Sequence, residues 1–309
     1  MNKTAIISPT NPGFLNWFII LLLGMIWGGS FLFIKISLET VGPLTSAAIR
    51  TLIGGMILIA VVLVKGQNLQ KINTTRAWSF SVLIGLISIA LPLYLLSWGQ
   101  QHVTSAYAGV SMSAIPLLIL PLVYFFSPDE GIGPRRVIGL ILGFAGLVIL
   151  FDINSIQLSS EKSQLLGQLA CFMATVCYAV GSILTRNAPH MPQIEFAAVT
   201  LISATLILTP LALYYEGLPY QLSFKSALAL LYLAFFASAL GAVLRIRVTK
   251  SAGSIFMSLT TYQVPIWALL YSALFLDETL PKTLFIALFL LIIGIIISQS
   301  RSLILFFKT

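Results

Sequence analysis

Long apolar stretches follow one another along the whole chain, with only short polar breaks between them. A helix needs about 20 apolar residues to cross the hydrocarbon core of a bilayer, and runs of that length recur from one end to the other. These runs do not alternate polar and apolar residues, as the strands of a membrane β-barrel do. Only 8% of the residues are charged, against about 25% in soluble domains. The sequence therefore predicts an all-α integral membrane protein and argues against a soluble enzyme.

Gly, Pro and charged residues divide the apolar sequence into ten predicted spans. The first span starts near Leu15 and is too long for the apolar region of a cleavable signal peptide. We place the spans at residues 15–37, 43–64, 78–100, 104–127, 135–152, 164–186, 193–214, 224–246, 251–276 and 281–299. None of the loops between them is long enough to form a second, soluble domain.

The Lys and Arg residues are distributed unevenly between the two sides that alternate loops define. If the N-terminus is cytoplasmic, twelve of the 17 face the cytoplasm. The other side then holds Lys35, Arg50, Lys162, Lys225 and Lys282. Because cytoplasmic loops carry the excess of positive charge, we expect a multi-pass protein of the cell (inner) membrane with both termini in the cytoplasm. The net charge of +8 is then a topology signal and predicts no binding of nucleic acid.

The two halves of the sequence repeat each other. Asp129-Glu130 matches Asp277-Glu278 at an offset of 148 residues, and Gly146 matches Gly294 at the same offset. Each half holds five spans, an odd number, so the second half must enter the membrane from the opposite side. Inverted repeats of this kind are typical of transporters, whose halves rock around a site near the bilayer midplane. The alternative is a duplication that is kept only for packing.

Several motifs in these halves resemble the EamA-type repeat of the drug/metabolite transporter superfamily. They are IWGGSFLFIK at 26–35, AAIR at 47–50, the passage from Tyr94 to Pro116, the acidic turn Asp129-Glu130 and its counterpart LDETL at 276–280. The resemblance implies one repeat at 15–152 and another at 163–299. It also implies a ten-helix metabolite transporter, of a kind that often exports amino acids or related small solutes.

Polar and aromatic side chains within the spans mark a candidate substrate site. Polar groups in hydrocarbon need partners, either on other helices or in a water-filled cavity. Residues four apart share a helix face, as Tyr107 and Ser111 do, and Tyr178 and Ser182. The candidate substrate-binding residues are Trp27, Ser30, Tyr94, Tyr107, Ser111, Tyr178, Ser182, Tyr262 and Gln263. Interhelical hydrogen bonds for Ser and Thr, and an interfacial belt for Trp and Tyr, are the alternatives.

The remaining polar groups and the small residues suggest supporting roles. Lys35 and Arg50 flank the outer ends of spans one and two, where they either extend to the interface or meet a substrate carboxylate. Glu39, four residues after Lys35, offers that lysine a local ion pair. Small residues four apart, at Gly24–Gly28 and Gly139–Gly143, predict close helix packing. Spans five and ten are nearly all aliphatic, so we expect spans one, three, four, six, eight and nine to line the cavity.

Catalytic and cofactor chemistry finds no support in the sequence. Two Cys and two His do not assemble a metal cluster, and Cys171 and Cys177 are about 9 Å apart along a helix, too far for a disulfide. No acidic residue or histidine lies at mid-depth in a span; Glu195 only begins span seven. We therefore expect no cofactor, no metal and no enzyme activity, and transport without proton coupling.

The sequence as a whole predicts a transmembrane transporter of small metabolites. With what the resemblance implies, we expect an exporter of amino acids or related amphiphilic solutes that works by alternating access as a monomer in the lipid bilayer. A membrane scaffold or assembly protein without transport activity remains the alternative.

Overall fold

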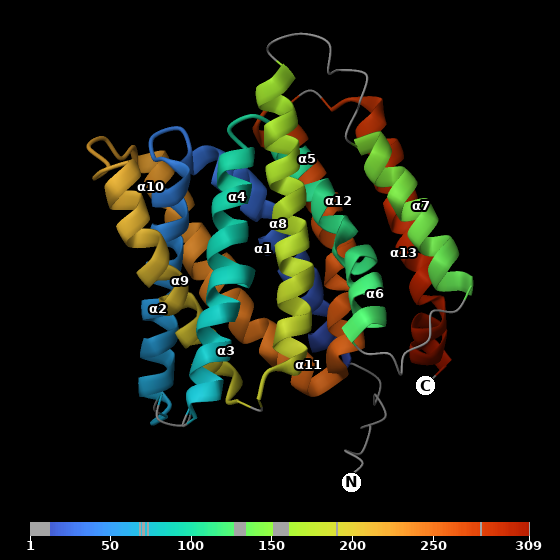
Figure 1. The fold of residues 1–309 in the computed structure, drawn as a ribbon, viewed down its shortest axis with the longest axis horizontal. Helices are drawn as coiled ribbons and strands as arrows, with labels where there is room; N and C mark the ends of the chain where they lie inside the picture. The colour runs from blue at the N-terminus through green and yellow to red at the C-terminus, as the bar shows by residue number, and fades with distance from the viewer. Residues whose placement is uncertain are drawn as a thin grey trace.

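Helices form along the predicted apolar stretches. The computed structural model describes residues 13–67, 69, 72, 74–126, 134–150, 161–189, 191–278 and 280–308, and every long element in them is helical (Figure 1). The uninterrupted helices are α1 (Gly13–Ser37), α2 (Pro43–Val64), α7 (Pro134–Leu150), α8 (Glu161–Asn187), α9 (Gln193–Tyr215), α12 (Thr260–Phe275) and α13 (Lys282–Lys308). The composite helices are α3 (Thr75–Gly85), η2 (Leu86–Ala90) and α4 (Leu91–Gly99); α5 (Ser105–Ser111), η3 (Met112–Ala114) and α6 (Ile115–Phe126); and α10 (Phe224–Tyr232), η5 (Leu233–Leu240) and α11 (Gly241–Ser258).

Six helical segments of the described residues are long and apolar enough to cross a membrane. They cover Gly13–Ser37, Pro43–Val64, Thr75–Gly99, Lys162–Asn187, Gln193–Tyr215 and Phe224–Gly253. Three shorter apolar helices lie at Ser105–Ile119, Val137–Leu150 and Lys282–Ile297. The chain is therefore a multi-pass membrane protein.

The predicted boundary between spans eight and nine is wrong. The sequence placed a loop at 247–250, but α11 runs through it to Ser258, and α12 begins only at Thr260. Arg247 and Lys250 therefore lie on a helix. The backbone leaves the helical region at Gly253, with φ 87° and ψ 164°, a conformation that favours glycine. The break thus follows the cationic segment instead of coinciding with it.

Two π-helical stretches occupy corresponding places in the two halves. η2 begins at Leu86 and η5 at Leu233, which is close to the offset that relates the acidic turns. Wide turns of this kind are rare and often occur at functional sites. Their recurrence shows that the repeat extends from the sequence to the irregularities of the backbone.

The helices of one half pack against those of the other. α1 packs on α10, α11 and α12, while α8 packs on η2, α4 and α6. α2 pairs with α9, and α7 pairs with α13. The first residues of α1 and the last of α13 lie toward one face, at the bottom of Figure 1. We call this the terminal face, and the other the opposite face.

Glycines bring the helices together, as the sequence predicted. A Cβ atom at Gly28 would lie 2.9 Å from the carbonyl oxygen of Val264 in α12. A Cβ atom at Gly294 of α13 would lie 2.6 Å from the carbonyl oxygen of Gly139 and 2.8 Å from the nitrogen of Gly143 in α7. Backbone therefore meets backbone at both crossings, which only small residues allow.

Carboxylates bind the starts of two helices at the opposite face. Glu216, just after α9, accepts hydrogen bonds of 2.8 Å from the backbone nitrogens of Leu44 and Thr45 in α2. Glu278 accepts hydrogen bonds from Ser105 in α5, at 2.9 Å from its backbone nitrogen, and from Ser272. Acids at helix N-termini satisfy free N–H groups and the helix dipole. Both acids belong to the second half and both helices to the first, so these bonds join the halves.

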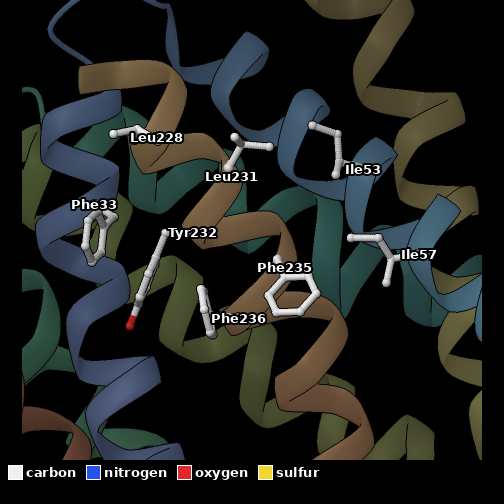
Figure 2. A pocket seen from close by; sticks show the side chains of 8 residues that line it. All are labelled: Phe33, Ile53, Ile57, Leu228, Leu231, Tyr232, Phe235 and Phe236. Carbon is white, nitrogen blue, oxygen red and sulfur yellow. The ribbon is translucent and has the colours of Figure 1, made fainter. Parts of the chain in front are cut away.

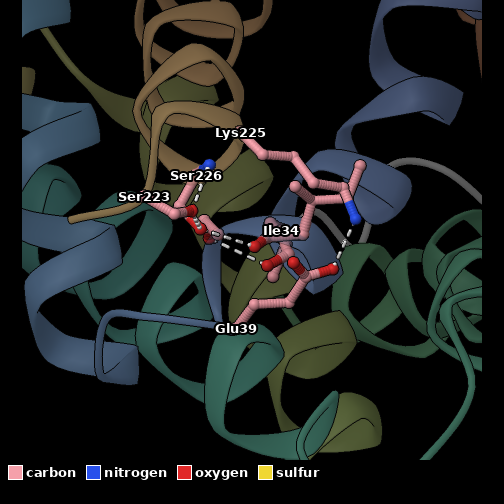
Figure 3. A network of polar contacts seen from close by, with 7 residues as sticks. Ile34, Glu39, Ser223, Lys225 and Ser226 are labelled. Atoms are coloured by element: carbon pink, nitrogen blue, oxygen red, sulfur yellow. Dashed lines mark hydrogen bonds and ion pairs between the residues drawn. The ribbon is translucent and has the colours of Figure 1, made fainter. Parts of the chain in front are cut away.

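A further polar network joins α1 to α10 at the same face. Figure 3 shows the ion pair of Lys225 and Glu39, whose charged atoms are 2.8 Å apart. The hydroxyl of Ser226 donates to the carbonyl of Ile36 at 3.0 Å. Glu39 is thus paired with Lys225 instead of with Lys35, which the sequence suggested.

Candidate functional site

Polar side chains of several helices meet at the π-helical stretch η5. The indole nitrogen of Trp27 in α1 donates to the carbonyl of Ala237 at 3.1 Å. Next to it, Nε of Arg50 in α2 donates to the hydroxyl of Ser238 at 2.9 Å. Tyr178 of α8 and Tyr232 of α10 lie within electrostatic range of the Arg50 guanidinium. We call Trp27, Arg50, Tyr178, Tyr232 and Ser238 the arginine site.

The approach of α2 to η5 is what places Arg50 inside the bundle. Arg50 lies seven residues after Pro43, which is about 10 Å along the helix axis. One turn further, a Cβ atom at Gly54 would lie 3.1 Å from Cβ of Ser238 and 3.2 Å from the carbonyl oxygen of Ala234. Because α2 presents a glycine there, its backbone comes close to η5 and the arginine side chain reaches across to Ser238.

The Arg50 side chain does not extend to the membrane interface. It is half-buried and points to the middle of the composite helix α10–η5–α11. The sequence allows an interfacial position or a substrate contact at the outer mouth, and the structure places the guanidinium deeper than either. The missed signal was its depth in the span, since a cation two turns from the helix start lies below the headgroups.

Lys35, the other cation of this region, has a different role. Its ammonium donates to the backbone carbonyls of Gln100 at 2.6 Å and Val103 at 3.2 Å. These carbonyls lie at the end of α4, where a positive charge complements the helix dipole. Lys35 thus closes the turn between α4 and α5.

Three of the predicted aromatic residues share one apolar cluster with the buried faces of α5 and α8. Tyr107 is only 7% exposed, and Tyr178 and Tyr262 pack at the margin of the cluster. The Tyr107 hydroxyl has no hydrogen-bond partner among the described residues. Ser111 is buried there too, and its backbone carbonyl accepts a hydrogen bond from Thr175 at 3.4 Å.

The other predicted residues lie elsewhere. Tyr94 packs against the contact of α2 with α9. Gln263 packs over Gly24, where an added Cβ atom would lie 2.9 Å from Oε1 of the glutamine. Ser30 and Ser182 donate to carbonyls of their own helices, at 3.2 Å and 2.9 Å. The structure therefore brings Trp27 and Tyr178 to the arginine site, but not Tyr94.

One face of α8 changes from buried to exposed along its length. Cys171 and Thr175 are fully buried, Tyr178 is half-buried, and Ser182 and Thr185 are exposed. These residues are three or four apart and share a face.

The side of α8 that points away from these residues is apolar and exposed, at Leu166, Leu169 and Met173. This is the side that we expect to contact lipid. The exposed hydroxyls of Ser182 and Thr185 therefore face away from that lipid surface. The polar side of α8 is therefore buried in the half toward the opposite face of the bundle and exposed in the half toward the terminal face.

An apolar groove of about 500 Å³ lies beside the arginine site. Figure 2 shows its lining, which comes from α1, α2 and α10–η5: Phe33, Ile53, Ile57, Leu228, Leu231, Tyr232, Phe235 and Phe236. The hydroxyl of Tyr232 turns away from the groove toward α1, where it donates to the carbonyl of Ile26 at 3.1 Å. The groove offers no polar group to a solute and suits hydrocarbon chains.

Comparison with known proteins places this architecture among membrane transporters. The profile of the EamA-like transporter family matches residues 15–152 and 165–299. The uncharacterized transporter YvbV of Bacillus subtilis is 25% identical over 91% of this chain and 90% of its own length. The uncharacterized inner membrane transporter YedA of Escherichia coli is 25% identical over 89% of this chain and 87% of its own. Protein PecM of Dickeya dadantii is 25% identical over 90% of each chain. A crystal structure with 20% identity has a TM-score of 0.67 and covers 93% of this chain and 98% of its own, which shows a shared fold.

Proposed function

Because this chain belongs to the EamA-like transporter family and is a multi-pass membrane transporter, we propose that it carries a small amphiphilic solute, such as an amino acid, out of the cell by alternating access. The chain acts as a monomer with ten membrane crossings, arranged as inverted five-helix repeats at 15–152 and 163–299. Both termini are cytoplasmic.

The recurrence of η2 and η5 and the exchange of packing partners support the inverted arrangement. α1 rests on the second half and α8 on the first, as expected when two similar units are related by an axis in the membrane plane. Such a pair has two states that differ in which face is open.

The arginine site is the observation that carries the proposal. It combines aromatic surface from Trp27, Tyr178 and Tyr232 with the guanidinium of Arg50. Sites for small solutes are mostly apolar, with a few polar groups that fix orientation. An amphiphilic solute matches both parts.

The exposure of α8 suggests which state the structure represents. The polar face of α8 is exposed toward the terminal face, and the bonds of Glu216 and Glu278 join helices of the two halves at the opposite face. With the terminal face in the cytoplasm, a solute enters the site from inside the cell, which is the loading step of an exporter.

Orientation in the membrane gives the first test. We expect epitope tags at both ends of the chain to react with antibody only after the cells are permeabilised, because the excess of Lys and Arg lies on that side. A tag engineered into the 217–223 loop, on the opposite face, serves as the control and must react on intact cells. Reaction of a C-terminal tag on intact cells would reverse every assignment of sides.

Transport without a proton gradient gives the second test. The described acids in helices lie near helix ends; Glu195, the most buried at 2% exposed, is in the first turn of α9. We expect counterflow of a labelled amino acid in proteoliposomes to be undiminished by a protonophore. A scaffold protein would give no counterflow at all. Accumulation that depends on an imposed proton gradient would contradict the proposal, and Glu195→Gln would then test the coupling residue.

A further inference from the structure

The geometry of the arginine site points to a binding site for a carboxylate. We propose that Arg50 binds the carboxylate of the transported solute, and that the ammonium group of an amino acid has no ionic partner in the site. This inference rests on the proposed transport function and narrows it to organic acids with an apolar or aromatic tail.

The guanidinium of Arg50 has N–H groups that make no hydrogen bond to the described residues. Its only hydrogen bond within the described part of the chain uses Nε, which donates to Ser238. The two terminal nitrogens have no partner there, and no described acid forms an ion pair with the side chain. A charge inside the membrane pairs with an opposite charge or with backbone carbonyls, and substrate pathways are among the sites that it marks. The solute is the natural source of the missing anion.

The bond to Ser238 also orients the guanidinium. Arginine binds a carboxylate through two parallel N–H groups. Because Nε is already engaged, the free pair is the one formed by the two terminal nitrogens at the end of the side chain. Ser238 thus holds the plane of the guanidinium and leaves its outer edge for two carboxylate oxygens.

The surroundings of Arg50 supply the place for an apolar tail. Trp27 is fixed by its bond to Ala237, the residue before Ser238, and Tyr178 lies within electrostatic range of Arg50 from α8. These aromatic side chains near the cation provide apolar surface for a flat or aliphatic tail attached to the carboxylate. None of the five described residues that define the arginine site is an acid, so a solute that carries only an amine meets a like charge at Arg50.

Three probes that differ only in their charged groups test the inference. They are phenylalanine, 3-phenylpropanoate, which lacks the amine, and 2-phenylethylamine, which lacks the carboxylate. Binding is measured by the thermal stability of the purified full-length protein over a range of probe concentrations. We expect both carboxylates to stabilise the wild-type protein and the amine not to. In Arg50→Gln the affinity for both carboxylates should fall roughly 10- to 100-fold, as expected for hydrogen bonds to charged groups.

Other variants separate binding from folding. Arg50→Lys keeps the charge but loses the paired N–H groups, so it should bind the carboxylates more weakly than wild type and more tightly than Arg50→Gln. Ser238→Ala should weaken carboxylate binding about three- to tenfold, since it releases the guanidinium without removing it. Arg247→Gln removes an exposed cation of α11 and is the matched control, with unchanged affinity.

The inference fails if the amine binds the wild-type protein as well as the carboxylates do, or if neither carboxylate binds. It also fails if a folded Arg50→Gln or Arg50→Lys protein keeps wild-type affinity for the carboxylates. Counterflow of a mixed pool of labelled metabolites into wild-type proteoliposomes distinguishes failure of the carboxylate site from failure of the proposed transport function. Transport of amines or neutral solutes overturns the carboxylate site alone, whereas no transport of any solute overturns the proposed function.

Discussion

Leucine at position 28 should remove nearly all folded protein from the membrane. The Cβ atom alone would lie 2.9 Å from the carbonyl oxygen of Val264 and 3.1 Å from the nitrogen of Ala268, and it would overlap Trp267. Two of these neighbours are backbone atoms of α12, so relief requires the whole helix to move. Inserting even single methylenes into a packed core costs roughly 1–3 kcal/mol, and leucine adds four carbons. We expect at least a tenfold loss of the monodisperse peak in size-exclusion chromatography.

Gly54→Ala is the graded control for this substitution. Its Cβ atom would lie 3.1 Å from the Ser238 side chain and 3.2 Å from the nearest backbone atom, so a shift of a few tenths of an ångström relieves the contact. It should lower the melting temperature by only a few degrees. A Gly28→Leu protein that elutes and melts like wild type would show that α1 and α12 do not pack as described.

Alanine at Trp27 or Tyr178 should lower transport about tenfold or more while membrane abundance changes little. Each substitution removes a ring from the wall of the arginine site, and Trp27→Ala also frees η5 from its bond to α1. A solute that loses an aromatic contact loses both affinity and orientation. Initial rates of counterflow, normalised to the amount of reconstituted protein, provide the measurement.

Conservative variants identify what each ring contributes. Trp27→Phe keeps an aromatic surface but cannot donate to Ala237, and Tyr178→Phe loses only a hydroxyl. If the rings form the wall, both should retain most of the transport. Normal transport by both alanine variants would mean that the solute binds elsewhere in the bundle.

Local sequence patterns were sufficient to predict much of the fold. Apolar runs, prolines and charged breaks predicted where most helices begin and end, and small residues four apart predicted the crossings at Gly28 and Gly143. The segment 247–250 was misread because its charge resembles a loop, whereas Arg and Lys are good helix formers. Composition alone does not reveal that such a segment continues a helix.

The candidate site was predicted only in part, for a different reason. Trp27 and Tyr178 stood out because aromatic residues at mid-span have no interface to occupy. The role of Arg50 depends on Ser238, which lies 188 residues away, and on the fit of Gly54 against η5. The caps that Glu216 and Glu278 provide likewise depend on helices of the other half. No local pattern encodes these contacts, since they arise only when the halves are packed together.

The pairing of α7 with α13 has a mechanical consequence. At Gly294 the backbone of α13 meets the backbone of Gly139 and Gly143 with no side chain between them, so a shift of one helix at this crossing brings backbone against backbone. These are the last helices of the two repeats, and they lie side by side at one edge of the bundle (Figure 1). If the two repeats rotate relative to each other during transport, we expect this helix pair to lie on the rotation axis. The distance between spin labels on α7 and α13 should then stay constant throughout the cycle, while helices farther from the axis show the largest displacements.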